Sequence, residues 1–183
     1  MRNGFTLIEL IVAVSIFSIA VSSLSALFVT GLRGQRSAIA QQNLVDNARF
    51  ALERMARQIR MAQRDETGAC TGVTTDRLTF KASASSLTFL DYRAPPKCVR
   101  YELTSGKILM YPDLVLQPLV SYEISSSDIT VTQLEFLVQG GAASDGEQPR
   151  ITMVFKAEAG ASPQALAKVQ LQTTISARNV DTP

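Results

Sequence analysis

The fold is decided by residues 5–32, which read FTLIELIVAVSIFSIAVSSLSALFVTGL. This run contains no proline, and Glu9 is its only charged residue. As an α-helix that rises about 1.5 Å per residue, it reaches roughly 42 Å, more than the hydrocarbon core of a bilayer requires. The sequence therefore predicts the transmembrane half of a helix over residues 5–32.

Two ordinary alternatives compete for the same run. The apolar region of a cleaved secretory signal peptide is usually about 7–15 residues long and ends at a small-residue cleavage site, which fits this longer run poorly. A plain signal anchor fits the length, but Glu9 argues against it. A carboxylate within a membrane segment is costly, so Glu9 is expected to have a partner and a function.

Residues 4–9, GFTLIE, resemble the prepilin processing motif of type IV pilins and type II secretion pseudopilins. The resemblance implies a leader at residues 1–4, cleavage by prepilin peptidase between Gly4 and Phe5, and methylation of the new amino group of Phe5. It gives Glu9 a role in assembly, in which the carboxylate pairs with the ammonium of Phe5 on an adjacent subunit. Other pilin or pseudopilin subunits, the inner-membrane assembly platform and membrane lipid are the further partners that it implies.

The orientation in the membrane rests on two signals that disagree. Arg33 and Arg36 flank the far end of the span and only Arg2, with the amino terminus, flanks the near end, so the count of positive charges favours a cytoplasmic C-terminal side. The margin is one residue, and the processing motif and the cysteines favour the opposite orientation. We expect a single-pass protein of the inner membrane, with its N-terminus in the cytoplasm and its globular part in the periplasm or at the cell surface.

The helix is expected to continue to about Gln63 as an amphipathic half over residues 33–66. One apolar stripe recurs at steps of three and four residues, which is the spacing of one helix face. It consists of Leu44, Ala48, Leu52, Met55, Ile59 and Ala62. A second stripe, well away from it, consists of Arg49, Glu53, Arg57, Arg60 and Arg64. The first stripe predicts packing on a globular domain, and the second is interpreted as a solvated face.

A possible interface lies outside the apolar stripe. On a helical wheel, Phe50 and Met61 nearly superpose, and Arg54 and Arg57 lie beside them. These two apolar residues either cover the edge of their own sheet or contact a neighbouring subunit, with the arginines selecting an acidic partner. Both interpretations remain open on the sequence alone.

Residues 67–183 are expected to form the β-rich globular part, because the apolar pattern changes to a period of two. The expected strands are 77–81, 86–90, 98–103, 108–111, 129–139, 150–157 and 167–176. Gly106 gives the hairpin signal between the third and fourth of them. The predicted fold class is therefore α+β, with a long N-terminal helix covering one face of an antiparallel sheet.

The two cysteines, Cys70 and Cys98, suggest one disulfide in an oxidising compartment. Two separate buried thiols are the alternative.

Catalytic and metal chemistry find little support. The chain contains no histidine, which excludes a His-ligated metal site, a Ser-His-Asp triad and a Cys-His dyad. Asp145 and Glu147 supply fewer oxygens than the six to eight that Ca²⁺ takes. We expect no catalytic residue, no metal and no cofactor, and the formal net charge of +2 does not by itself favour a nucleic-acid partner.

Residues 48–60 and 171–179 are similar to minor subunits, most closely the J-type pseudopilin of type II secretion and the W-type minor pilin. Such subunits form a tip complex that starts the filament, although the outermost tip subunit typically lacks the glutamate that Glu9 provides. A major pilin, or a pilin-like module that binds DNA or a secreted substrate, is the alternative, and a tethered enzyme ranks behind both. The number of copies per filament separates a tip subunit from a major pilin.

Overall fold

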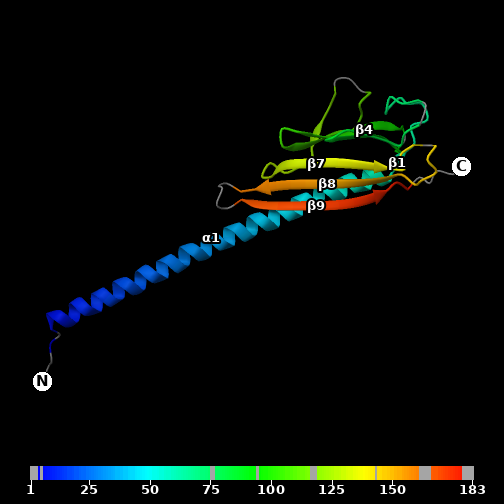
Figure 1. Cartoon of the computed structure of the whole chain (residues 1–183). Coiled ribbons are helices and arrows are strands. Elements are labelled where there is room, and N and C mark those ends of the chain that lie inside the picture. Colours follow the sequence, from blue (N-terminus) through cyan, green and yellow to red (C-terminus); the bar gives the residue numbers. More distant parts are fainter. Residues whose placement is uncertain are drawn as a thin grey trace. The chain divides into compact units, whose positions relative to one another are not determined.

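The computed structural model describes residues 4, 6–74, 77–93, 95–115, 119–142, 144–160 and 166–178 (Figure 1). Its contacts divide into two compact units, Met1–Ile39 and Ala40–Pro183, which we describe separately. A single helix, α1, runs from Leu7 to Arg60 and contributes to both units.

In the first unit, α1 is long and apolar enough to cross a membrane, judged by length and composition. Its large apolar side chains from Leu7 to Leu32 are exposed. Each hydroxyl along this stretch donates to the carbonyl four residues earlier, at 2.8 or 2.9 Å, as recorded for Ser15, Ser18, Ser22, Ser23, Ser25 and Thr30. Because every hydroxyl proton of residues 7–32 has an acceptor within the helix, none of them needs water, which suits an apolar environment.

In the second unit, α1 buries the predicted apolar stripe. Leu44, Ala48, Leu52, Met55 and Ile59 are buried, and Ala51 joins them. The face that carries Phe50, Arg54 and Arg57 stays exposed.

The helix ends at Arg60, before the predicted end near Gln63. Ala62–Gln63 instead forms a short strand, β1, which pairs with Ser86–Asp91, β3. The last carbonyl groups of a helix have no partner within the helix. That of Arg60 accepts the backbone N–H of Arg178 at 2.9 Å, which helps to fix the helix end. Ala62 is still buried, but as a strand residue.

The strands form two antiparallel sheets rather than the single sheet that the sequence suggested. The larger sheet has the order β1-β3-β4-β5-β6, and β2 also pairs with β3. Its remaining members are β2 (Phe80–Ala82), β4 (Lys97–Thr104), β5 (Lys107–Tyr111) and β6 (Tyr122–Glu123). The smaller sheet has the order β7-β8-β9, formed by Thr130–Gln139, Arg150–Ala159 and Ala167–Ser176. The predicted α+β class with antiparallel sheets is confirmed.

The hairpin between β4 and β5 is the tightest turn in the larger sheet. Ser105 and Gly106 both have positive φ, 51° and 77°. Two successive residues of this kind form the turn whose twist matches that of antiparallel strands, and glycine adopts the conformation without strain. The signal at Gly106 therefore predicted this connection correctly.

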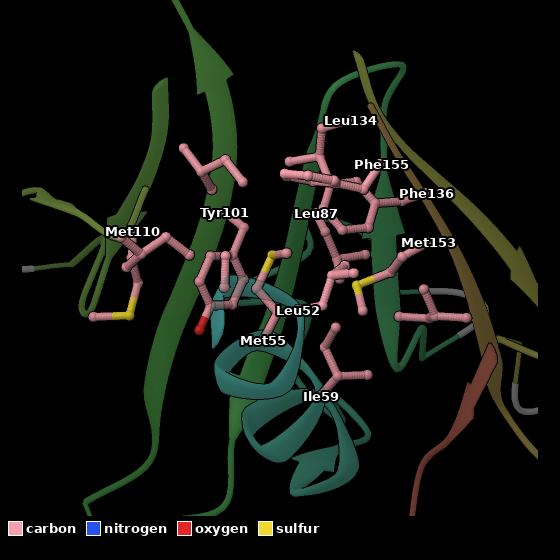
Figure 2. Close-up of a cluster of buried hydrophobic side chains, with 14 of the residues drawn as sticks. Leu52, Met55, Ile59, Leu87, Tyr101, Met110, Leu134, Phe136, Met153 and Phe155 are labelled. Carbon is pink, nitrogen blue, oxygen red and sulfur yellow. The ribbon is translucent and has the colours of Figure 1, made fainter. Parts of the chain in front are cut away.

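The core lies where α1 meets both sheets. Figure 2 shows side chains of α1 between those of the larger sheet and those of the smaller one. The helix contributes Leu52, Met55 and Ile59, the larger sheet Leu87, Tyr101 and Met110, and the smaller sheet Leu134, Phe136, Met153 and Phe155. The hydroxyl of Tyr101 also donates to the side chain of Gln58. One face of the helix is thus committed to the core, and the opposite face is left for other contacts.

The loop after β1 is organised by a buried carboxylate. Asp65 accepts the backbone N–H groups of Ala69, Cys70 and Thr71, at 3.2, 2.8 and 2.7 Å. Cys70 in this loop is joined by a disulfide to Cys98 at the start of β4, with the Cα atoms 5.3 Å apart. Asp65 therefore positions the loop that carries one end of the disulfide.

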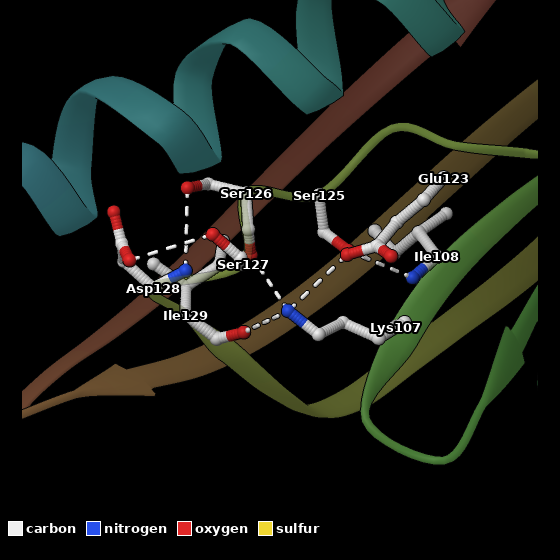
Figure 3. A network of polar contacts seen from close by, with 8 residues as sticks. All are labelled: Lys107, Ile108, Glu123, Ser125, Ser126, Ser127, Asp128 and Ile129. Carbon is white, nitrogen blue, oxygen red and sulfur yellow. Dashed lines mark hydrogen bonds and ion pairs between the residues drawn. The ribbon is translucent and has the colours of Figure 1, made fainter.

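A lysine ties the larger sheet to the segment that leads into the smaller one (Figure 3). Lys107 Nζ donates to the carbonyls of Ser126 and Ile129, at 2.8 and 3.1 Å, and lies 3.2 Å from Glu123 Oε1. The backbone N–H of Val131, in β7, adds a bond of 2.9 Å to Gly106 O. These contacts connect the β4–β5 hairpin to the first strand of the smaller sheet.

Candidate functional site

The N-terminus of α1 is closed by Thr6 and Glu9. The backbone N–H and the hydroxyl of Thr6 donate to Glu9 Oε2 at 2.9 and 3.0 Å, and the backbone N–H of Glu9 lies 3.4 Å from Thr6 Oγ1. This reciprocal arrangement is a capping box, which satisfies backbone donors that a helix start leaves without partners. It explains why the helix begins at Leu7 and places the Glu9 carboxylate in the first turn, where the helix dipole favours negative charge.

The sequence interpretation missed the role of Thr6. Threonine followed three residues later by glutamate, ahead of an apolar run, is itself the signature of a capping box. Glu9 is thus held by its own chain before any second subunit is considered. Phe5, the predicted site of methylation and the predicted partner of Glu9, lies outside the described residues.

Gly4, the residue before the predicted cleavage site, is exposed. A Cβ atom added there would meet no other atom within 4 Å. Nothing in the described part of the chain therefore requires glycine at this position.

The predicted interface residues separate into two neighbouring hollows. Phe50, Arg54 and Arg57 line one hollow together with Gln58 and Arg93. Met61 lies just beyond the helix end and lines the next hollow, which it shares with Arg57. Phe50 is 58% exposed, so most of this aromatic side chain is not covered by its own domain.

The remaining carboxylates considered for metal binding are used within their own loop. Asp145 accepts the backbone N–H groups of Ala142 and Glu147, at 3.0 and 2.9 Å, and Glu147 lies 3.9 Å from Arg150. Within the described ranges, no three histidine, cysteine, aspartate or glutamate residues gather in a way that could hold a metal ion.

A long N-terminal apolar helix packed on antiparallel sheets defines an α+β, pilin-like architecture. Residues 1–25 match the family described as the prokaryotic N-terminal methylation motif. This match supports a pilin or pseudopilin that is processed by prepilin peptidase and assembles with other pilin subunits. Together with the apolar helix, it supports anchoring in a membrane. Pilins are a family of structural subunits. No curated protein and no solved structure matches the chain.

Proposed function

We propose that the chain is a minor pilin or pseudopilin subunit that helps to initiate a filament near its tip, in a type IV pilus or a type II secretion pseudopilus. The methylation motif at residues 1–25 coincides with a capped helix whose apolar side chains are exposed, and together they support a pilin or pseudopilin. The minor role near the tip is inferred from the resemblance of residues 48–60 and 171–179 to minor subunits. Removal of residues 1–4 would leave a new ammonium at Phe5, four positions from the Glu9 carboxylate. Residues 5–32 then form the transmembrane half of the helix, residues 33–66 its amphipathic half, and residues 67–183 the β-rich part outside the cytoplasm.

Gly4 is the motif residue that directly precedes the proposed cleavage site. A Cβ atom added there would meet no atom of the described chain, so the folded subunit leaves this position open to a requirement of the processing enzyme. A side chain at this position would crowd the peptidase rather than the folded subunit.

The exposed apolar helix supports assembly. A row of large apolar side chains left uncovered along α1 needs lipid or other helices around it. Methylation keeps the terminal amine able to carry its charge, so the amine of one subunit can compensate the Glu9 carboxylate of the next. Each group would otherwise be left uncompensated in an apolar environment.

Intact-mass analysis of the membrane form tests the proposal. We expect the loss of residues 1–4 and the gain of one methyl group on Phe5. The matched control is Gly4→Val, which should keep its full mass and its normal thermal stability, because the new side chain meets no atom of the described subunit. A mature terminus near residues 20–25 would show an ordinary signal peptide and would overturn the proposal.

A further inference from the structure

We propose that a groove at the C-terminal end of α1 docks an acidic segment of another filament subunit. We call it the arginine groove and define it by Arg54, Arg57, Arg60, Arg93 and Arg178, together with the exposed apolar residues Phe50, Met61 and Tyr92. The inference rests on the proposed function only in taking the partner to be a filament subunit.

The groove is assembled from three separate parts of the chain. Arg54, Arg57 and Arg60 come from α1, Arg93 from the connection between β3 and β4, and Arg178 from the residues after β9. The first hollow, which contains Phe50, and the second, which contains Ser176, share Arg57. The second hollow and a third, which contains Tyr92, share Arg60, Met61 and Arg178. The shared walls make the three hollows one continuous surface.

The positive charge of this surface exceeds what the described part of the chain neutralises. Among the described residues, two carboxylates pair with the five guanidinium groups: Glu53 lies 3.6 Å from Arg57, and Asp91 lies 2.7 Å from Arg93. The Arg57–Glu53 pair is highly exposed and therefore contributes little. Among the residues that the structure describes, no ion pair is recorded for Arg54, Arg60 or Arg178.

The helix dipole explains only part of this charge. Cations in the last turn of a helix are favoured, which accounts for Arg57 and Arg60 without any partner. It does not account for Arg93 and Arg178, which belong to other elements. Arg93 is moreover held in a fixed position, since its Nε and Nη2 both donate to Asp91 Oδ2, at 3.1 and 2.7 Å.

The composition of the groove favours a protein partner with carboxylates. Every basic residue that lines the three hollows is an arginine, and the planar guanidinium matches a carboxylate with two parallel hydrogen bonds. Phe50, Tyr92 and Met61 are 58%, 57% and 36% exposed, and arginine with aromatic residues and methionine is typical of the centre of a protein interface. The two built-in carboxylates and the net charge of +2 favour nucleic acid less. The occupant is therefore expected to carry at least two aspartate or glutamate residues beside an apolar side chain.

The test measures binding of two labelled probes to the full chain in detergent. The first probe is the peptide Glu-Glu-Leu-Phe-Glu-Glu with its glutamine counterpart as a control, and the second is a DNA duplex of about 20 base pairs. We expect the acidic peptide to bind, the glutamine peptide to bind at least fivefold more weakly, and the affinity to fall as salt rises from about 50 to 300 mM.

Variants then locate the binding. The double variant Arg57→Glu and Arg60→Glu, which reverses two exposed charges, should weaken peptide binding at least tenfold. Arg49→Glu is the matched control, because Arg49 is an exposed arginine of the same helix that does not line the three hollows. It should change the affinity less than twofold. Phe50→Ser should weaken binding while leaving the melting temperature unchanged, and it replaces the double variant if that one does not fold.

The inference is overturned if the acidic peptide does not bind, if the double variant and Phe50→Ser both bind as the wild type does, or if the duplex binds more tightly than the peptide. The mass of the processed N-terminus is recorded for each variant. Normal processing with absent peptide binding would reject the arginine groove alone and leave the proposed function standing.

Discussion

At the scale of single residues, the two oxygens of Glu9 have different surroundings. Oε2 accepts both hydrogen bonds from Thr6, at 2.9 and 3.0 Å. No hydrogen bond to Oε1 is recorded among the described residues. A carboxylate can accept on both oxygens, so an ammonium from another subunit can pair with Oε1 while the helix cap stays intact.

Replacing Glu9 with glutamine distinguishes the contribution of the helix cap from that of the negative charge. Glu9→Gln keeps a side chain that supports a capping box, whereas Glu9→Ala removes both the cap and the charge. We expect both variants to insert into the membrane and both to be impaired in entering filaments, because the ammonium of Phe5 loses its counter-charge. The measurement is the ratio of subunit in sheared filaments to subunit in membranes. Normal incorporation of Glu9→Gln would show that charge pairing is not required.

Asp65 links the pH dependence of stability to the loop that carries Cys70. Burial raises the pKa of this carboxyl group, but the hydrogen bonds from Thr71, Cys70 and Thr67 together outweigh it, so the pKa is lowered from its ordinary value. A group with a lowered pKa in the folded state stabilises the fold above its unfolded pKa of about 3.9, and this stabilisation is lost as the pH falls through the folded pKa.

We therefore expect Asp65→Asn to lower the free energy of unfolding at pH 7 by about 2–3 kcal/mol, because hydrogen bonds to a charged group are among the stronger ones. The difference from the wild type should begin to shrink as the pH falls below about 3.9, where the carboxyl group of the unfolded chain starts to bind a proton, and it should be lost only below the lowered pKa of the folded state. Denaturant unfolding of the full chain in detergent at pH 7 and at acid pH measures it. Asp46→Asn, at an exposed position on α1, is the control and should be nearly neutral. An equal effect of both substitutions would contradict the role given to Asp65.

At the scale of elements, long periodic segments were predictable and short ones were not. The stripe from Leu44 to Ile59 repeats over several turns, and β8 and β9 each alternate over ten residues, so these patterns are longer than chance would produce. In β7 the alternation shifts at a bulge between Val131 and Gln133 and is regular after it. β1 and β6 have two residues each, too few to show a period. Their existence depends on pairing with distant strands. The division into two sheets has the same origin, because alternation tells which face of a strand is buried and not which sheet contains it.

The disulfide joins two elements, the loop after β1 and strand β4. We expect both cysteines to be oxidised in envelope material, so that thiol blocking before reduction labels neither Cys70 nor Cys98 in mass spectrometry. For a sequence separation of 28 residues, the chain-entropy model gives a stabilisation of about 3–4 kcal/mol, which the double serine variant should lose. Labelling of both cysteines without reduction would refute the bridge.

At the scale of the whole molecule, the candidate site was only partly accessible from the sequence. A helical wheel places Phe50 beside Arg54 and Arg57, because one helix fixes their relation. No local pattern can bring Arg93 or Arg178 to the same surface, since their positions follow from the way the strands fold back onto the helix. The arginine groove is thus a property of the tertiary structure, and only its helical edge is a property of the sequence.

The contact made by Lys107 brings a permanent positive charge to the junction between the two sheets. Two backbone carbonyls and the carboxylate of Glu123 surround its ammonium group, and oxygen ligands of this kind are also those that calcium prefers. Here the positive charge is bound covalently to β5, so it cannot be diluted away or removed by a chelator. At this junction, a charge that stays attached to the chain holds together three oxygen groups that would otherwise repel one another.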